Sequence, residues 1–418
     1  MTLSPSASLR VNSAGGLLSE RPLGRSVMKF LRFAQNDRDG LMQRRVSKQI
    51  QIGDVKIGGD APIVVQSMCS TDTADVAATV RQIHALAELG CEVVRVAVPD
   101  KEAAAALPEI VRQTPVPLVA DIHFDYRWAL AAIRSGFHAL RLNPGNIRDP
   151  EKVKAVVKEA KERGIPIRIG VNAGSLPPIP SLADGELPPS IVDRMVDAAL
   201  WEIKILEEMD YDNIKISLKA FDVPTMVEAN RRLAKMVPYP LHLGVTEAGT
   251  PRAGSVRSAI GIGILLSEGI GDTIRVSLAA DPQEEIPVCW DILASLGLRR
   301  RGPILVACPT CGRIEIDLIP LANKVEEHFT RLGKPITVAV MGCVVNGPGE
   351  AKMADLGIAG GKGRGVIFRK GEIIRTVDEP QFMDALIEEG NRVIAEMDGA
   401  EVAPYAGDDA LIPIQSLQ

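Results

Sequence analysis

Short apolar runs alternate with stretches of helical periodicity from about residue 46 onward. Eight of these runs have the length and the β-branched content of strands. They are Ile63–Met68, Glu92–Val98, Leu118–Phe124, Ala139–Asn143, Ile165–Asn172, Ile214–Lys219, Leu241–Glu247 and Thr273–Leu278. Because a helical pattern follows each run, the order of elements predicts an α/β fold with a (β/α)8 barrel of the TIM type. A doubly wound open sheet is the alternative for the same order of elements.

The first helical pattern is the clearest of the series. Its apolar positions recur at steps of three and four between Val76 and Leu89, which is the spacing of one helix face. Gly90 follows where a C-terminal cap is expected, and Thr73 or Asp72 stands where an N-terminal cap is expected. We therefore expect one helix between these two signals.

Polar residues gather at the carboxyl ends of the predicted strands. They are Ser67, Arg95, His123, Arg141, Asn143, Arg168, Asn172, Lys219, Glu247, Arg275 and Ser277. TIM-barrel enzymes carry their chemistry at that end of the barrel. A single arginine at a strand end commonly forms a salt bridge, but several cations converging there predict an anion site suited to phosphate.

The pattern changes after about residue 300, where Arg299 to Pro303 predict a hinge. A small α/β domain is expected beyond it, with strands at Ile304–Ala307, Ile336–Met341, Gly357–Ala359 and Gly365–Phe368 and helices at about 320–332 and 380–397. The stretch G-I-A-G-G-K-G-R-G lacks the G-K-[ST] of a P-loop and predicts a flexible loop. The predicted units are an extension over 1–44, a barrel over 45–299, the small domain over 300–400 and a tail over 401–418.

Three cysteines in the small domain have the spacing of a metal or cluster site. Cys308 and Cys311 form a C-x-x-C pair, and Cys343 lies about thirty residues further on in V-M-G-C-V-V-N-G-P-G-E. Three thiolates suit an iron–sulfur cluster with one iron left for another ligand. A zinc site, a thiol redox pair and a packing role are the alternatives that this spacing leaves open. Cys91 and Cys289 stand in apolar contexts and are expected to be packing residues.

Composition narrows the class of protein. Apolar residues make up 46% of the 418 residues and charged residues 24%, which is typical of a globular protein. The net charge of −5 and the lack of a long basic run argue against nucleic acid as the main partner. No apolar stretch reaches the roughly 18 residues of a membrane span. Six cysteines in so long a chain do not predict a disulfide scaffold, so a reduced cytoplasm is expected.

The first 44 residues differ from the rest of the chain. They are rich in Ser, Gly, Leu and Arg, and they have no sustained period and no apolar core of a secretory signal. We expect a disordered extension or a start codon placed too early, with Met28 and Met42 as later starts. An organellar targeting segment is the alternative.

Seven motifs together resemble those of the 4-hydroxy-3-methylbut-2-enyl diphosphate synthase family of the non-mevalonate isoprenoid pathway. They are V-V-Q-S-M, R-L-N-P-G-N, R-I-G-V-N-A-G-S-L, L-G-V-T-E-A-G, G-I-G-D-T-I-R-V-S-L, C-P-T-C-G-R and V-M-G-C-V-V-N-G-P-G-E. The resemblance covers about residues 46 to 400 and is to the bacterial two-domain form. Cys69 departs from it, since a small polar residue is expected after Q-S-M.

The resemblance implies an iron–sulfur oxidoreductase. It implies one [4Fe–4S] cluster per subunit on Cys308, Cys311 and Cys343, with Glu350 as the fourth ligand. The implied reaction opens the ring of 2-C-methyl-D-erythritol 2,4-cyclodiphosphate with two electrons and loss of water, giving 4-hydroxy-3-methylbut-2-enyl diphosphate. Flavodoxin or ferredoxin is the implied electron donor. A homodimer is also implied, with the cluster domain of one subunit over the barrel of the other.

The resemblance also implies roles for the strand-end residues. Glu247 is expected to be the acid that protonates the leaving hydroxyl. The substrate-binding residues are expected to be Arg95, Arg141, Asn143, Arg168, Asn172, Lys219, Arg275, Ser277 and His123, the last with packing as its alternative role. Two other functional classes remain as alternatives, namely a phosphosugar-binding module with a structural metal knuckle and a dehydratase without net redox change.

Overall fold

The computed structural model describes residues 43–123, 125–143, 147, 149–176, 178, 187–343, 349 and 351–399. Phe124, Glu350, the Asn346–Pro348 part of the predicted glycine-rich turn, both alternative start sites, and nearly all of the predicted extension and tail lie outside these residues. Helices within the described ranges are all too short or too polar to cross a membrane.

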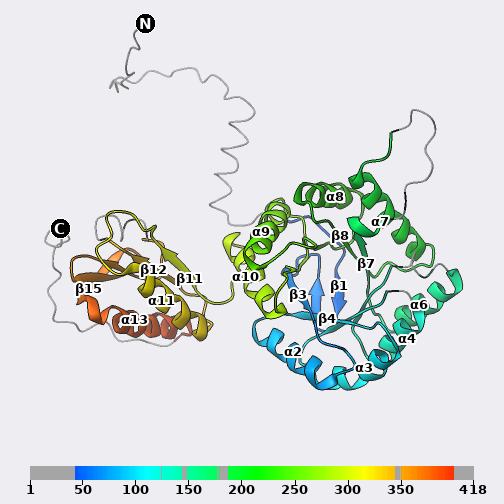
Figure 1. Ribbon diagram of the computed structural model, residues 1–418, viewed down its shortest axis with the longest axis horizontal. Coiled ribbons are helices and arrows are strands. Elements are labelled where there is room, and N and C mark those ends of the chain that lie inside the picture. The colour runs from blue at the N-terminus through cyan, green and yellow to red at the C-terminus, as the bar shows by residue number, and fades with distance from the viewer. Residues whose placement is uncertain are drawn as a thin grey trace, which may run out of the picture. The chain divides into compact units, whose positions relative to one another are not determined.

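A parallel eight-stranded sheet forms the first large unit (Figure 1). Its strands are β3 (Val64–Met68), β4 (Val93–Ala97), β5 (Leu118–Asp121), β6 (Ala139–Arg141), β7 (Ile167–Asn172), β8 (Ile214–Lys219), β9 (His242–Leu243) and β10 (Thr273–Ile274). Each lies within a run expected from the sequence. β9 and β10 are much shorter than their runs, because ladder pairing stops after two residues while the chain continues toward the mouth of the barrel.

The sheet closes on itself, so the doubly wound alternative is wrong. The strand order is β8-β7-β6-β5-β4-β3-β10-β9. A parallel bridge between Ile216 of β8 and Leu241, the residue before β9, joins the two ends of this order. The result is the TIM-type barrel that the order of elements predicts.

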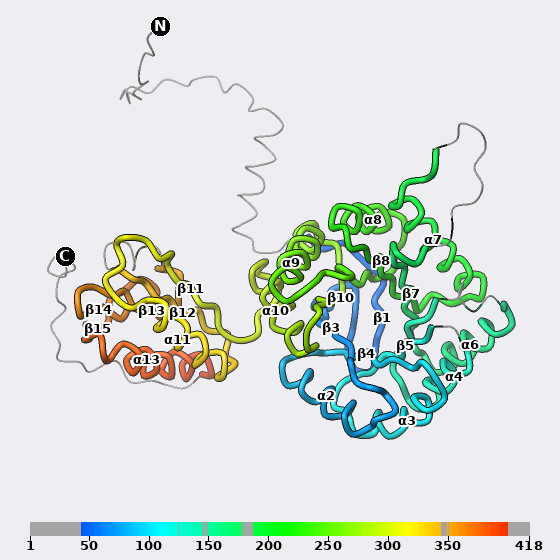
Figure 2. Tube along the Cα trace, viewed as in Figure 1, coloured from blue at the N-terminus to red at the C-terminus, as the bar shows by residue number. Residues whose placement is uncertain are grey.

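Helices ring the barrel strands (Figure 2). They are α2 (Val76–Glu88), α3 (Lys101–Gln113), α4 (Tyr126–Arg134), α6 (Pro150–Glu162), α7 (Ile191–Glu207), α8 (Val223–Met236), α9 (Pro251–Ser267) and α10 (Glu285–Ser295), with 3-10 turns at Ala173–Ser175 and Pro282–Glu284. Their buried faces and the outward faces of the strands form one continuous apolar core that includes Cys91 and Cys289. The packing role expected for these two cysteines is therefore confirmed.

The cap of α2 differs from the expectation. Asp75 is the N-cap, and its carboxylate accepts a hydrogen bond from the N–H of Ala78 at 2.9 Å. Thr73 instead donates its hydroxyl hydrogen to the carbonyl of Ala97. Asp72 accepts from the N–H of Ala74 in the preceding turn. Several potential capping residues follow one another here. The backbone conformation decides which of them accepts a hydrogen bond from the first turn of the helix.

A short antiparallel hairpin that the sequence analysis missed closes the amino-terminal end of the barrel. It consists of β1 (Ile50–Ile52) and β2 (Val55–Ile57). Its apolar side chains form a cluster with the first inward-facing residues of the barrel strands, which are Val64, Val93, Val119 and Ala139. The bottom of the barrel interior is thus apolar.

The second unit is a five-stranded sheet in the order β11-β12-β13-β14-β15. The strands are β11 (Ile304–Ala307), β12 (Thr337–Met341), β13 (Leu356–Gly360), β14 (Arg364–Arg369) and β15 (Glu372–Asp378), and the helices are α11 (Leu318–Leu332) and α13 (Phe382–Met397), the latter preceded by a 3-10 turn at Glu379–Gln381. β11 to β13 are parallel, and β14 and β15 are antiparallel to their neighbours. β15 was not expected from the sequence.

The glycine-rich stretch is a hairpin, and the prediction of a flexible loop is wrong. Gly357 and Gly360 lie in β13, paired with Phe368 and Gly365 of β14. A Cβ on Gly357 would lie 2.3 Å from the ring of Phe368, so the glycine leaves room for that ring. Glycine here serves close packing in a sheet rather than mobility.

Candidate functional site

Side-chain alternation turns the polar residues of each barrel strand into the barrel. Along β8, Lys215, Ser217 and Lys219 share one side, because successive side chains of a strand point to opposite faces. Ile216 and Leu218 lie on the other side, in the core beneath the helices. All six residues of this strand are buried, so the polar ones occupy the barrel interior.

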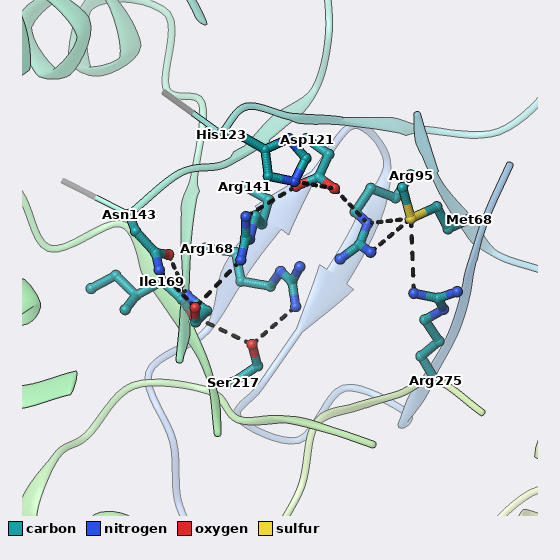
Figure 3. A network of polar contacts seen from close by, with 11 residues as sticks. Met68, Arg95, Asp121, His123, Arg141, Asn143, Arg168, Ile169, Ser217 and Arg275 are labelled. Carbon is teal, nitrogen blue, oxygen red and sulfur yellow. Dashed lines mark hydrogen bonds and ion pairs between the residues drawn. The ribbon is translucent and has the colours of Figure 1, made fainter. Parts of the chain in front are cut away.

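A cavity of about 140 Å³ lies among these inward-facing residues. Figure 3 shows the contacts that organise it. Its lining residues are Arg95, Asp121, His123, Arg141, Arg168, Gly170, Asn172, Ser217, Lys219, Thr246, Arg275 and Ser277. These residues come from seven of the barrel strands or from the segments that directly follow them.

Eight of the expected substrate-binding residues line this one cavity. They are Arg95, His123, Arg141, Arg168, Asn172, Lys219, Arg275 and Ser277. Asn143 does not line it: its side-chain amide donates to the carbonyl of Gly170 at 2.7 Å and accepts from the N–H of Gly170 at 2.9 Å. Asp121, Ser217 and Thr246 were missed. The sequence could have indicated Asp121 and Ser217, because side chains alternate between the two faces of a strand. Each stands two residues before an expected site residue, and therefore on the same face.

Asp121 is the acidic centre of the cluster (Figure 3). Its carboxylate lies 3.6 Å from Nε of Arg95, 3.5 Å from Nη1 of Arg141 and 3.8 Å from Nε2 of His123. Burial alone would raise the pKa of Asp121, but Arg95 and Arg141 hold this pKa below its ordinary value. The carboxylate is therefore ionised and partly neutralises two of the cations.

Met68 holds Arg95 from the other side. Its sulfur accepts hydrogen bonds from Nε and Nη2 of Arg95 at 3.0 and 2.7 Å, and from Nη1 of Arg275 at 3.8 Å. A thioether is a weak acceptor, so these contacts fix the guanidinium groups without neutralising them. Both groups therefore keep their capacity to bind a stronger acceptor.

Glu285 of α10 is the second carboxylate near the cations. It lies 3.5 Å from Nε of Arg275 and accepts the hydroxyl hydrogen of Ser67 at 2.7 Å. Ser67 thus faces the helices rather than the cavity. The prediction that Ser67 belongs to the polar residues of the site is therefore wrong. Alternation explains the error, because Ser67 lies between the inward-facing residues Gln66 and Met68.

Like charges crowd the cavity. Burial and the neighbouring charges of Arg275 and Arg141 lower the pKa of Arg95 to about 10, although Asp121 opposes this shift. The pKa of Lys219 is lowered well below its ordinary value, first by burial and then by Arg275 and Arg168. Buried cations that lower one another's pKa are stabilised by an anion between them. The cavity is suited to a phosphate group.

Glu247 lies outside this cavity and is exposed. Its backbone φ of 55° is in the left-handed region, where a residue other than glycine is strained. The next residue but one, Gly249, also has a positive φ of 109°. The segment after β9 therefore bends sharply and leaves the Glu247 carboxylate at the surface of the described barrel.

The cysteines of the second unit stand at the carboxyl ends of two neighbouring parallel strands. Cys308 follows β11 and Cys343 follows β12 after Gly342. The sulfur of Cys308 accepts a hydrogen bond from the N–H of Gly342 at 3.1 Å. Cys311 is exposed, and backbone and side-chain hydrogen bonds from Arg313 lower the pKa of its thiol.

This donor set fits a thiolate-bound cluster. All six cysteines of the chain lie in the described ranges and are free thiols. Hydrogen bonds to the ligand sulfurs, such as the one from the N–H of Gly342 to Cys308, are typical of iron–sulfur sites. Over the residues that the structure describes, no three His, Cys, Asp or Glu side chains are already gathered as a metal site. Glu350, the expected fourth ligand, lies outside them.

Together these features define a two-unit protein: a TIM-type barrel with a cation-lined cavity, followed by a small mixed-sheet unit that carries three free thiols. The family profile described as the GcpE TIM-barrel domain matches residues 47–290, and the profile of the GcpE protein C-terminal domain matches residues 304–392. The chain belongs to the GcpE family.

Several curated relatives of this chain are named 4-hydroxy-3-methylbut-2-en-1-yl diphosphate synthase (flavodoxin). The relative from Dehalococcoides mccartyi is 60% identical over 351 residues, which are 84% of this chain and 99% of the relative. The relative from Geobacter sulfurreducens is 56% identical over 84% of this chain and 98% of its own. A solved structure of dihydropteroate synthase from Stenotrophomonas maltophilia covers 60% of this chain and 97% of its own, with a TM-score of 0.44 and 14% identity.

Proposed function

We propose that this protein reduces 2-C-methyl-D-erythritol 2,4-cyclodiphosphate to 4-hydroxy-3-methylbut-2-enyl diphosphate, with two electrons and loss of water. The observation that carries the proposal is 60% identity over 99% of a relative named as the synthase of that product. The cation-lined cavity supports it independently, because the substrate's two phosphates are the groups that such a cavity attracts.

The barrel residues hold the diphosphate. Arg95, Arg141 and Arg275 keep hydrogen-bond donors that are bound only weakly or at a distance, so they are ready to bind phosphate oxygens. Arg168 and Lys219 add hydrogen-bond donors from the buried side of the cavity, and a bound anion favours the charged form of Lys219. The same cations stabilise the negative charge that develops on phosphate when its bond to carbon breaks. Asn172, Ser277 and His123 contribute further hydrogen bonds.

The three thiols hold a [4Fe–4S] cluster, one per subunit, and Glu350 supplies the fourth ligand. When bound, this group supplies the two electrons one at a time. Cys308, Cys311 and Cys343 provide soft ligands, and the carboxylate of Glu350 is a harder and more easily exchanged one. The N–H of Gly342 donates a hydrogen bond to the sulfur of Cys308 at 3.1 Å, a contact typical of cluster ligands.

Glu247 donates the proton to the leaving hydroxyl. Its exposure and strained backbone support a role at the cavity mouth, because strain is retained where it positions a functional group. Asn143 acts on the site through Gly170, whose carbonyl it fixes. It is a positioning residue.

The remaining parts of the proposal concern partners. Flavodoxin is the electron donor, as the names of the relatives state for those proteins, and ferredoxin is the alternative. The protein acts in the cytoplasm as a homodimer, in which the cluster domain of one subunit covers the barrel of the other.

An anaerobic assay tests the proposed reaction. Purified protein with its cluster intact is supplied with the cyclic diphosphate, dithionite and a dye mediator, and the product is identified by mass spectrometry. We expect the linear diphosphate and about four irons and four sulfides per chain. Turnover without any reductant would indicate a dehydratase, and colourless protein with one zinc would indicate a binding module. Either result contradicts the proposal.

A further inference from the structure

A second polar layer lies inside the barrel, between the cation-lined cavity and the apolar plug of β1 and β2. It consists of Gln66, Lys215, His242 and Thr273. These residues stand on four successive strands of the ring, since β8 is bridged to the start of β9, β9 pairs with β10, and β10 pairs with β3. Their exposed fractions are 0%, 2%, 0% and 0%. We call this group the inner polar layer.

The inner polar layer is sparsely hydrogen-bonded. Nζ of Lys215 lies 3.4 Å from Oε1 of Gln66 and 3.5 Å from Oγ1 of Thr273, which are long contacts. Both ring nitrogens of His242 and the side-chain nitrogen of Gln66 find no hydrogen-bond partner among the described residues. Buried polar groups are normally satisfied, so unmet capacity on this scale points to a role.

The electrostatic surroundings of Lys215 come from several strands of the barrel. The charged groups that act on Lys215 or His242 are Arg95 of β4, Arg168 of β7, Lys219 of β8 and Asp272 before β10, while Asp121, Arg141 and Arg275 line the cavity above and Glu285 of α10 pairs with Arg275 from the helix side. The cations among them outnumber the carboxylates. Below, the hairpin cluster is apolar and adds no charge.

Burial, followed by this excess of positive charge, favours a neutral amine at Lys215. Burial and then Arg168 lower its pKa well below the ordinary value, with Asp272 opposing them. Burial, Arg168 and Lys219 likewise lower the pKa of His242, whose imidazole is therefore neutral. An anion in the cavity above would offset the repulsion from Arg168 and Arg95 and would itself attract an ammonium group, so it would raise the pKa of Lys215 against the effect of burial.

We propose that Lys215 is a buried proton acceptor coupled to the anion site: when a diphosphate binds in the cavity, Lys215 takes up one proton from solvent and becomes an ammonium group. Oε1 of Gln66 and Oγ1 of Thr273 are the acceptors that receive its hydrogens. Binding is thereby favoured at lower pH by a residue that does not contact the ligand. The identity of the ligand rests on the proposed function, but the coupling requires only an anion.

Sulfate is the appropriate probe, because it is a doubly charged anion that does not itself titrate near neutral pH. Calorimetric titrations of sulfate into the full-length protein, in buffers of different ionisation enthalpy at one pH, give the number of protons exchanged on binding. We expect net uptake in the wild type and about one proton less in Lys215→Met. The matched control Lys154→Met removes an exposed lysine of α6 and should leave the number unchanged.

Lys215→Gln serves as a second variant if the methionine variant fails to fold. Its side-chain amide cannot take up a proton near neutral pH, but it can still donate a hydrogen bond to Gln66. The affinity of the wild type for sulfate should also fall as pH rises. The affinity of either Lys215 variant should fall less steeply. No proton uptake in the wild type, equal uptake in the Lys215 variants, or no sulfate binding would each overturn the inference. None of these results bears on anaerobic turnover of the cyclic diphosphate, so the proposed function stands or falls separately.

Discussion

Asn143 and Gly170 are joined by two reciprocal hydrogen bonds, from the side-chain amide of Asn143 to the carbonyl of Gly170 at 2.7 Å and from the N–H of Gly170 to the amide oxygen at 2.9 Å. The pair ties the end of β6 to β7. Arg141 and Arg168 project from these same two strands, and their Cα atoms are partners in the ladder. The asparagine that was expected to bind substrate therefore contacts the backbone of the strand that carries Arg168, and we propose that it positions the arginines of these two strands.

Asn143→Ala tests this positioning role. Loss of both bonds leaves backbone groups of Gly170 unsatisfied, so we expect the free energy of unfolding to fall by about 2 kcal/mol. The KM for the cyclic diphosphate should rise while kcat changes less, because the arginines are misplaced and the reacting groups remain. Asn172→Ala, which removes a cavity-lining amide on the same sheet, is the comparison. A rise in KM without any loss of stability would contradict the assignment, because it would indicate direct contact of Asn143 with the substrate.

Gly170→Ala should crowd Arg141. A Cβ at residue 170 would lie 3.1 Å from Nε of Arg141 and 3.4 Å from Oγ of Ser217, so the guanidinium must shift. Overpacking of this kind costs about 1–3 kcal/mol, so if the cost falls on the geometry of the anion site the affinity for sulfate is roughly 5- to 150-fold weaker. Gly174→Ala is a suitable control, because nothing lies within 4 Å of its added Cβ. Equal affinities in the two variants would show that Arg141 moves without consequence.

Glu247→Gln should separate binding from turnover. The amide keeps the size of the side chain but cannot donate the proton, so we expect kcat to fall by roughly 10²- to 10⁴-fold. Cluster absorbance and substrate affinity should remain, and both are measured on the same anaerobic sample. Glu268→Gln changes another exposed glutamate, at the end of α9, and serves as the control. Unchanged turnover in Glu247→Gln would remove its role as the acid.

Asp121→Asn should make the protein less stable and the cavity more attractive to anions. The carboxylate balances Arg95 and Arg141, and removing one partner of a buried ion pair costs roughly 3 kcal/mol. Because the pKa of Asp121 is held below its unfolded value of about 3.9, its contribution is fully present above that pH and is lost as pH falls through the folded value.

Urea unfolding of the wild type and Asp121→Asn therefore gives a difference in stability that is constant near neutral pH and shrinks below about pH 4. Sulfate affinity near neutral pH should be higher in the variant. A stability difference that stays the same across the acid range would mean that Asp121 is not the group that titrates.

Cys343→Ser should abolish the iron–sulfur absorbance of anaerobically purified protein, because a serine hydroxyl is a poor substitute for a soft thiolate. Cys91→Ala removes a thiol that is 2% exposed in the barrel core and should leave the absorbance unchanged, although it lowers stability. Removal of iron from the wild type by a chelator should have the same spectral effect as Cys343→Ser. Full iron content in Cys343→Ser would contradict the ligand assignment.

Local pattern was sufficient for the barrel strands and for most of the cavity. Alternation along β8 alone places Lys215, Ser217 and Lys219 on one face, and the order of strands and helices brings the strand ends to one mouth. The spacing of Cys308, Cys311 and Cys343 likewise required no coordinates. Each of these inferences depends on residues that are near one another in sequence or on a rule of chain direction.

Contacts between distant residues decided the rest. The bridge from Ile216 to Leu241 closes the barrel, Asp121 is shared by cations from two other strands, and Asn143 meets Gly170 instead of the cavity. The exposure of Glu247 and the burial of Lys215 among like charges also emerge only when the ring is complete. A repeating pattern indicates which face a side chain occupies, but the identity of its partner depends on register and closure, which are properties of the whole barrel.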